Sequence, residues 1–291
     1  LSCFTHTSTL ESGGLSDMSR ELWLRFKRNR GAMFGVFTLA SLSLFSVSVV
    51  LTGRAGPFEL VSDPFQPPSL QHPFGTDDLG RDIFVQSAYG LSITLMVGAA
   101  AAFLSGLIGI LIGSVSGYFR GAVEQATTAI IEIFQSLPLF FLVLVLISFF
   151  GSNIVNIILA LGLTLWASTA RIQRGQVISV KNQTFVEMSK LVGEKEYNIL
   201  IREILPNSVQ PSIVNISYTA SIAIIVESGL AFLGLGDPRM MSLGFIIGNA
   251  RYFFFQAWWM GLLPGILLFL TVLSLNMVSD GFNEMLNPKR G

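Results

Sequence analysis

Five stretches of the sequence contain no Asp, Glu, Lys or Arg, and each is at least 23 residues long: 31–53, 83–119, 133–170, 204–226 and 252–279. A bilayer core about 30 Å thick needs roughly 20 apolar residues to be crossed by a helix. The third stretch is interrupted at residues 151–153, Gly-Ser-Asn, which divides it into two spans. With 51% hydrophobic and only 12% charged residues, the chain is expected to be an all-α membrane protein of about six transmembrane helices.

The order of these spans predicts the domain organisation. A tail over 1–30 precedes a first transmembrane helix at 31–53, and a proline-rich loop over 54–87 follows it. A five-helix core over 88–281 and a tail over 282–291 complete the chain. The spans expected within the core are 88–117, 124–149, 154–170, 209–233 and 257–280.

The distribution of Lys and Arg predicts how the chain is oriented. With the N-terminus inside, the cytoplasmic segments hold 14 of the 18 basic residues: five in 20–30, Arg120, six in 171–202, Lys289 and Arg290. The loops on the other side keep only four, namely Arg54, Arg81, Arg239 and Arg251. The positive-inside rule therefore favours cytoplasmic N- and C-termini and places 54–87 outside.

The charge balance and the cysteine count argue against two classes of function. The formal net charge is zero, which gives no reason to propose a nucleic-acid partner. Cys3 is the single cysteine, and His6 and His72 are the only histidines, so no Cys/His metal cluster is expected. We therefore assign no metal site and no catalytic residue to this chain.

The second span is rich in small residues at four-residue spacing. Gly98, Ala102 and Gly106 form one such row, and Gly109, Gly113 and Gly117 form another on an offset face. Because helices in lipid associate through close packing, this span is expected to lie buried against other helices.

Two acidic residues lie well inside predicted spans, away from the span ends, where charge is costly. Glu132 precedes Ser136 and Pro138 in the third span, and Pro138 is expected to kink that helix. Glu227 lies late in the fifth span. These four residues are candidates for the lining of a translocation path. The alternative is that the two acids make interhelical hydrogen bonds that only stabilise the fold.

The predicted cytoplasmic segment 171–208 is far longer than an ordinary connection. Thr184 and Glu187 have the spacing of a capping box, which predicts a helix start, and Gly193 is expected to end that helix. Its apolar residues recur at helical spacing: Phe185, Met188, Leu191 and Val192.

A second helix is expected after Gly193, with an apolar face made of Tyr197, Leu200, Ile201 and Ile204, and with Pro206 and Asn207 at its end. A two-turn helix such as the first is unstable alone, so it must dock on something. Lys190 is its single basic residue, which favours a protein partner over a membrane surface.

Four blocks of sequence resemble one known family. Glu187-Met188-Ser189, Gly193 and the run ILPN at 204–207 resemble the Glu-Ala-Ala loop of ABC importer permeases, with Met188 and Ser189 in place of the usual alanines. Three further blocks resemble the C-type permease of dipeptide, oligopeptide and nickel importers: HPFGTDDLGRDIF at 72–84, GLAFLGLG at 229–236 and WWMGLLPGILLFLTVLSLNMVSDG at 258–281.

The resemblance implies a type I ABC importer permease in the inner membrane of a prokaryote. Its implied partners are a B-type permease that completes a heterodimer, two cytoplasmic ATPases that bind ATP and Mg, an extracytoplasmic solute-binding protein, and membrane lipid. The sequence contains no Gly-Lys dipeptide and hence no Walker A loop, so ATP is expected on the partners alone. The implied ATPase-coupling residues are Thr184, Phe185, Glu187, Met188, Ser189, Leu191 and Gly193.

Three alternatives remain open at this point. The same architecture could import nickel or a metal chelate in place of peptides. A secondary transporter is less favoured, because the sequence shows no inverted repeat with paired discontinuous helices. A membrane scaffold that anchors a cytoplasmic enzyme would explain the docking helix but not the polar residues within spans.

Overall fold

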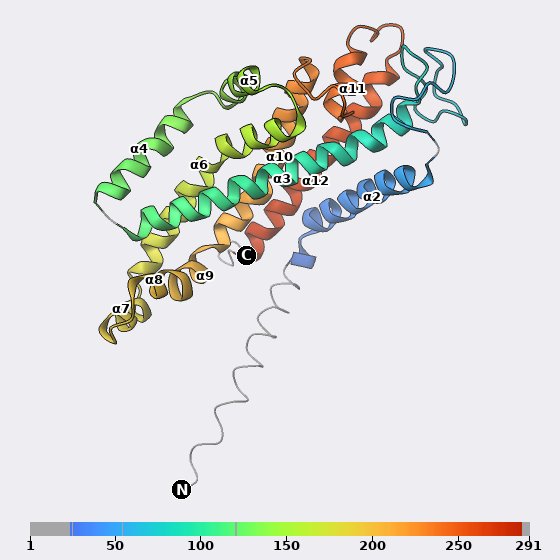
Figure 1. Cartoon of the computed structure of the whole chain (residues 1–291). Helices are drawn as coiled ribbons and strands as arrows, with labels where there is room; N and C mark the ends of the chain where they lie inside the picture. Colours follow the sequence, from blue (N-terminus) through green and yellow to red (C-terminus); the bar gives the residue numbers. More distant parts are fainter. Residues whose placement is uncertain (1–23, 25, 54, 120, 287–291) are drawn as a thin grey trace.

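The computed structural model describes residues 24, 26–53, 55–119 and 121–286, and this part of the chain is built from helices and connecting loops, with one isolated β-bridge between Thr76 and Asp82 (Figure 1). The helices are α2 (Arg30–Thr52), α3 (Ile83–Tyr118), α4 (Ala122–Ser136), α5 (Leu139–Phe150), α6 (Ile154–Lys181), α7 (Thr184–Leu191), α8 (Glu196–Asn198), the π-helix η1 (Ile199–Ile204), α9 (Leu205–Ser208), α10 (Gln210–Phe232), α11 (Leu243–Ala250) and α12 (Trp259–Leu286).

Five helices are long and apolar enough to cross a membrane: α2, α3, α6, α10 and α12. The bent pair α4 and α5 makes a sixth span if it is counted as one. The prediction of an all-α membrane protein with about six transmembrane helices is therefore confirmed. The predicted tails over 1–30 and 282–291 lie largely outside the described residues.

The third predicted span, 124–149, is not one continuous helix. It is broken between Ser136 and Leu139, and the two halves meet at 91°. Leu137 has an extended backbone, φ −86° and ψ 138°, because the ring of a following proline disfavours helical geometry in the preceding residue. The kink expected at Pro138 is thus a sharp bend, and Pro138 itself precedes the first residue of α5.

Two helix boundaries differ from the sequence prediction. Helix α3 begins at Ile83, within the predicted loop 54–87, because the Asp82 side chain caps it by accepting a hydrogen bond from Phe84 N at 2.8 Å. Helix α6 does not end near 170 but continues to Lys181. A helix that leaves an apolar layer keeps its backbone hydrogen bonds, so the end of an uncharged stretch does not mark the end of a helix.

Helix α3 packs closely on two neighbouring helices, and each of its two glycine rows contacts a different one. A Cβ added to Gly98 would lie 2.5 Å from Cγ1 of Ile224 on α10. A Cβ added to Gly113 would lie 2.5 Å from the carbonyl oxygen of Ala170 on α6. The close contacts expected from these rows are therefore present, one row facing each neighbour.

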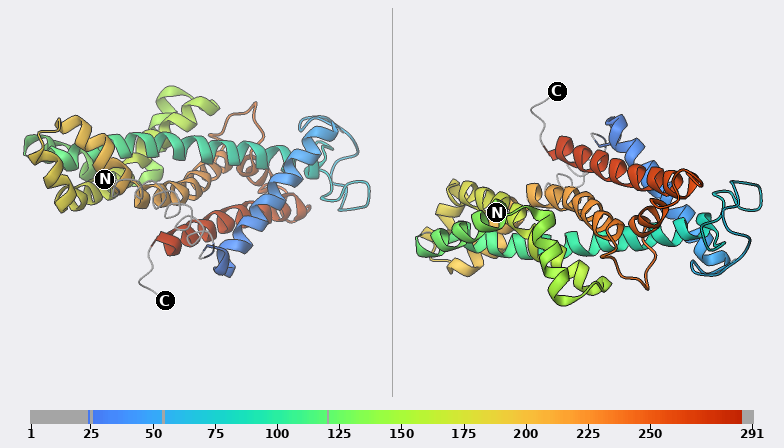
Figure 2. Two further views of the ribbon diagram at one scale, coloured as in Figure 1. Left: turned by 90° about the horizontal axis from the view of Figure 1, so that it is seen from below. Right: turned by 90° about the horizontal axis from the view of Figure 1, so that it is seen from above.

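Helices α3, α6 and α10 form the middle of the molecule, with α4 and α5 on one side and α2 and α12 on the other (Figure 2). Segments α7–α9 lie at one end, and α11 lies at the opposite end with the ordered segment 55–82 (Figure 1). Near the α7 end, Phe26, which precedes α2, meets the last turns of α12, where the Phe26 and Phe282 rings lie 5.2 Å apart. At the opposite end, Trp259 Nε1 donates to the Thr76 carbonyl at 3.3 Å.

Candidate functional site

Helix α7 begins one residue earlier than a capping box of Thr184 and Glu187 would require. Gln183 is its N-cap, with an extended backbone and no side-chain hydrogen bond, and Thr184 is the first helical residue. The Gln183 carbonyl accepts from Val186 N at 3.0 Å and from Glu187 N at 3.3 Å. The predicted capping box of Thr184 and Glu187 is therefore wrong, although the helix it predicted is present.

Gly193 ends α7 in the manner expected. Its φ is +83°, and it donates to the Lys190 carbonyl at 3.0 Å, while Glu194 N donates to the Ser189 carbonyl at 3.2 Å. These two bonds form a Schellman motif, which needs a left-handed residue at this position. A Cβ on Gly193 would meet nothing within 4 Å, so the requirement for glycine comes from the backbone and not from space.

The two faces of α7 have different surroundings. Val186 is fully buried, whereas Leu191 and Val192 are 82% and 88% exposed. Phe185 and Met188 are exposed as well. The apolar face predicted from the spacing is thus the outward face, and a residue outside that set attaches the helix to the rest of the chain.

The helix after α7 departs from the prediction in two ways. It does not end at Pro206, because α9 continues to Ser208 and α10 follows at Gln210. Pro206 lies in the first turn of α9, where its missing N–H is tolerated. The π-helical turn before it, in which Leu205 N donates to the Leu200 carbonyl, joins the two segments without a break.

The same π-helical turn changes which side chains are buried. Tyr197 and Ile201, predicted on the apolar face, are exposed, whereas Ile199 was not predicted and is fully buried together with Ile204. A π-turn contains more residues than an α-turn, so the face shifts relative to a period of 3.6. Periodicity alone contains no signal for this shift.

Helices α3, α6, α7 and η1 share one small hydrophobic core. Its buried residues are Tyr118, Val177, Val180, Val186, Ile199 and Ile204. Lys181 strengthens the junction, since its Nζ donates to the Tyr118 carbonyl at 2.5 Å and lies 4.7 Å from the centre of the Tyr118 ring. Helix α7 is therefore attached to the ends of two long helices.

Next to this core, the buried side-chain amide of Gln173 on α6 is hydrogen-bonded to three other helices. Gln173 Nε2 donates to Ser114 Oγ at 3.1 Å and to Ser208 Oγ at 3.0 Å, and Gln173 Oε1 accepts from Ser212 Oγ at 2.7 Å. The amide thus connects α6 to α3, α9 and α10. Sequence reasoning missed it, because a glutamine after the end of the uncharged stretch reads as a solvent-exposed residue.

The four candidates for a translocation path are divided between α4, the bend that follows it, and α10. Glu132 is exposed on α4, and the hydroxyl of Ser136 donates to the Ile133 carbonyl of its own helix at 2.9 Å. Pro138 lies at the 91° bend. Glu227 on α10 is only 4% exposed and accepts a hydrogen bond from Ser228 at 3.3 Å. These surroundings favour a packing role for Glu227, and its part in a path stays a prediction.

Opposite the α7 end, an aspartate connects two loops. Asp237, between α10 and α11, accepts from Ile154 N at 3.1 Å and so caps the start of α6. Burial alone would raise the pKa of Asp237. Hydrogen bonds from the backbone and side chain of Arg239 and from Ile154 N, together with the Arg239 charge, outweigh burial and hold this pKa below its usual value.

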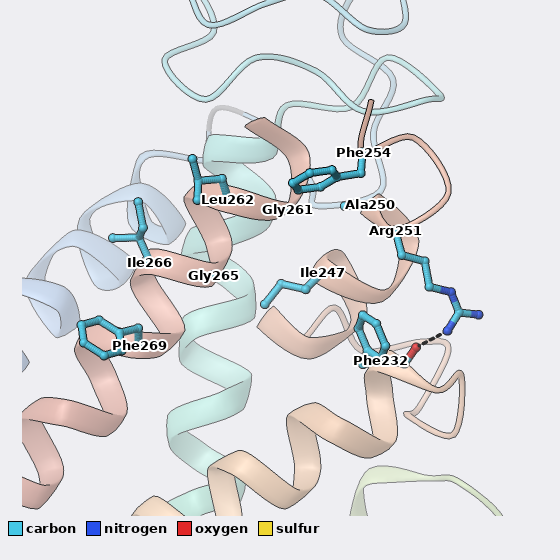
Figure 3. Close-up of a pocket in the computed structure, with 10 residues that line it drawn as sticks. All are labelled: Phe232, Ile247, Ala250, Arg251, Phe254, Gly261, Leu262, Gly265, Ile266 and Phe269. Atoms are coloured by element: carbon cyan, nitrogen blue, oxygen red, sulfur yellow. Dashed lines mark hydrogen bonds between the residues drawn. The ribbon is translucent and has the colours of Figure 1, made fainter. Parts of the chain in front are cut away.

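An apolar cavity of about 460 Å³ lies between α10, α11 and α12 at this same end (Figure 3). Phe232, Ile247, Leu262, Ile266 and Phe269 line it. Arg251 lies at its edge, donates to the Phe232 carbonyl at 3.0 Å and covers the Phe232 ring at 5.4 Å. Among the described residues, no group of three His, Cys, Asp or Glu side chains is arranged to hold a metal ion.

Comparison with known proteins identifies the architecture. Residues 109–291 match the family described as "Binding-protein-dependent transport system inner membrane component". Residues 18–68 match the "N-terminal TM domain of oligopeptide transport permease C". The chain belongs to this family of ABC importer permeases. Its members are membrane subunits of binding-protein-dependent transport systems, so this permease is a multi-pass inner-membrane protein.

Curated relatives match the permease over most of its length. It is 37% identical to the "Dipeptide transport system permease protein DppC" of Bacillus subtilis, over 93% of this chain and 86% of the relative. It is 34% identical to the "Oligopeptide transport system permease protein OppC" of the same organism, over 94% of this chain and 92% of the relative.

Two solved structures share the fold. The MetNI methionine ABC transporter in an inward-facing conformation aligns with a TM-score of 0.55 at 20% identity, over 66% of this permease and 91% of the matched chain. An amino acid ABC transporter with histidines aligns with a TM-score of 0.52 at 15% identity, over 67% of this permease and 91% of the matched chain. At these identities the likeness concerns the fold alone.

Proposed function

We propose that this permease forms half of the translocation pathway of an ATP-driven importer for di- or oligopeptides. A B-type permease would complete the pathway, a solute-binding protein would deliver the peptide, and two ATPases would bind ATP and Mg. The names of the relatives at 37% and 34% identity support peptide as the substrate class. The predicted orientation, with both termini and α7 in the cytoplasm, belongs to the same proposal.

The observation that carries the proposal is the outward apolar face of α7. Leu191 and Val192 are largely exposed at one end of the molecule, beyond the long apolar helices, and Phe185 and Met188 extend this face. Exposed apolar side chains on a helix that is itself firmly attached are typical of a surface that a partner covers. The ATPase is the partner that an importer needs at this end.

The attachment of α7 supports a role in force transmission. Val186 anchors it in the core shared with α3 and α6, and Gly193 fixes its end. Movement of an ATPase docked on α7 would therefore be passed to two membrane-spanning helices. Glu187, Thr184 and Ser189 complete the docking segment in this proposal. Ser189 Oγ already donates to the Phe185 carbonyl at 3.1 Å.

The docking proposal is tested with Met188→Ser and Leu191→Ser in the complete importer. We expect each to reduce copurification of the ATPases several-fold, because each removes an interfacial apolar side chain. Leu70→Ser is the matched control, since Leu70 is fully exposed at the opposite end. Normal ATPase recovery with both α7 variants would show that α7 is not the docking segment.

The substrate proposal is tested by uptake into proteoliposomes that hold the complete importer. We expect uptake of labelled di- and tripeptides to depend on ATP and on the binding protein. Uptake of nickel or a nickel chelate without peptide uptake would contradict the proposed substrate and leave the permease assignment intact.

A further inference from the structure

A polar recess of about 370 Å³ lies at the α7 end, between α6, α10 and α12. Its polar lining comes from Gln210, Asn215, Tyr218, Asp280 and Asn283, with Ser279 beside them. Asp280 is the only charged residue among the described residues that line it. The recess therefore combines one negative charge with several neutral hydrogen-bonding groups.

The carboxylate of Asp280 is exposed, and no described residue forms an ion pair or a hydrogen bond with it. Its neighbour on the helix is engaged differently, because Ser279 Oγ donates to the Val214 carbonyl at 3.2 Å and fixes α12 against α10. Asn215 is also fixed, since its Nδ2 donates to Thr169 Oγ1 at 2.9 Å and leaves the amide oxygen free to accept. The recess thus combines a fixed amide acceptor with a carboxylate that pairs with no described residue.

Exposed side chains of α10 extend beyond the recess along one face of the helix. Tyr218 lines the recess, and Tyr218, Ile225 and Phe232 are exposed at a spacing of seven residues, which puts them on one face. Phe232 lines the apolar cavity at the opposite end. Between Tyr218 and Phe232, Ile225 is the only other residue of α10 that is exposed, so the exposed face of α10 leads from the recess towards the apolar cavity.

The chemistry of the recess fits one part of a peptide. An importer of peptides meets variable side chains, but every peptide with an unblocked N-terminus carries a protonated amino group as well as backbone amides. An unpaired carboxylate recognises an ammonium group through charge-assisted hydrogen bonds, and amide and phenol groups recognise backbone amides. We propose, on the basis of the proposed function, that this recess binds the protonated amino group of the transported peptide, with Asp280 as its counter-ion.

The test uses the complete importer in proteoliposomes with its binding protein, and compares initial uptake of trialanine with uptake of N-acetyl-trialanine. Asp280→Asn removes the charge and keeps the shape. The preference is the ratio of the initial uptake rates of trialanine and N-acetyl-trialanine. The binding protein is the same in every preparation, so its own contribution to this ratio cancels when the ratios of two permease variants are compared. We expect Asp280→Asn to reduce this preference about tenfold, as loss of a charge-assisted bond would.

Two variants serve as controls. Asp280→Glu keeps the charge, so it should preserve most of the preference. Glu284→Gln changes an acid one turn further along α12 whose carboxylate accepts from Asn29 and so faces α2; it should leave the preference unchanged. An unchanged preference in Asp280→Asn, or an equal loss in Glu284→Gln, overturns the assignment of Asp280. Failure of the unaltered importer to take up trialanine overturns the proposed function and this site with it.

Discussion

The side chain of Gln173 accepts a hydrogen bond from Ser212 at 2.7 Å, and this bond joins α6 to α10 in a fully buried position. The same amide donates to Ser114 and Ser208. A single side chain thus holds three serines from three other elements, next to the core that attaches α7.

Replacement of this amide should destabilise the permease. We expect Gln173→Leu to lower the free energy of unfolding by about 1–3 kcal/mol, because buried hydroxyls lose their partner. Thermal unfolding in detergent is the measurement, and Gln135→Leu, at an exposed position of α4, is the control. Equal unfolding temperatures for the Gln173 variant and the unaltered protein would contradict this interpretation.

The glycine rows of α3 allow a second prediction. Gly113→Ala should destabilise the protein by about 1–3 kcal/mol, since its Cβ would lie 2.5 Å from a backbone oxygen that cannot turn away. Gly175→Ala on α6 is the matched control, because a Cβ there meets nothing within 4 Å and alanine favours the helix. Thermal unfolding should separate the two variants, and equal behaviour would count against close packing of α3 on α6.

Gly193 provides a third prediction, local to α7. At φ +83°, Gly193→Val should cost about 1–2 kcal/mol of strain, and Gly193→Asn should cost less, because asparagine tolerates left-handed geometry. We expect faster hydrogen exchange over 184–208 in the valine variant, with little change in the long helices. Equal exchange rates for the two variants would show that the backbone at this position does not need its left-handed conformation.

Much of the fold could be predicted from the sequence, because burial in lipid imposes long apolar stretches that are easy to recognise. The spans around Gly31, Gly98 and Ile224 illustrate this. The position of the bend between α4 and α5 could also be predicted, from Pro138. The size of the bend, 91°, could not. Bend size depends on what the two halves pack against, and here α4 and α5 bury only Ile131, Val143 and Ile147 between them.

The candidate site was less accessible to sequence reasoning. The outward face of α7 could be predicted from its spacing, and Gly193 from its position after the last turn. The burial of Val186 and the hydrogen bonds of Gln173 could not be predicted, because each side chain contacts residues that are distant in the sequence. The π-helical turn at Ile199 likewise shifts the buried face away from the one that a period of 3.6 predicts.

Asp237 allows a pH prediction. A carboxyl whose pKa is lowered in the folded state contributes stability above its unfolded pKa, about 3.9, and loses it as the pH falls through the lower folded value. Asp237→Asn should therefore lower the unfolding temperature at pH 7, and its difference from the unaltered protein should shrink below about pH 4. A difference that stays constant across this range would contradict the role given to the charge.

The length of α3 has a mechanical consequence. Its 36 residues extend about 54 Å, from the Asp82 cap at one end to Tyr118 beside the α7 core at the other. If a rigid helix of that length tilts by about 5° about one end, its other end moves by about 5 Å. Because α3 packs closely on α10 at Gly98 and on α6 at Gly113, such a tilt would also move α6 and α10. At 36 residues α3 is much longer than the roughly 20 that a bilayer core requires, and this extra length is what would enlarge a small tilt into a displacement of several ångströms.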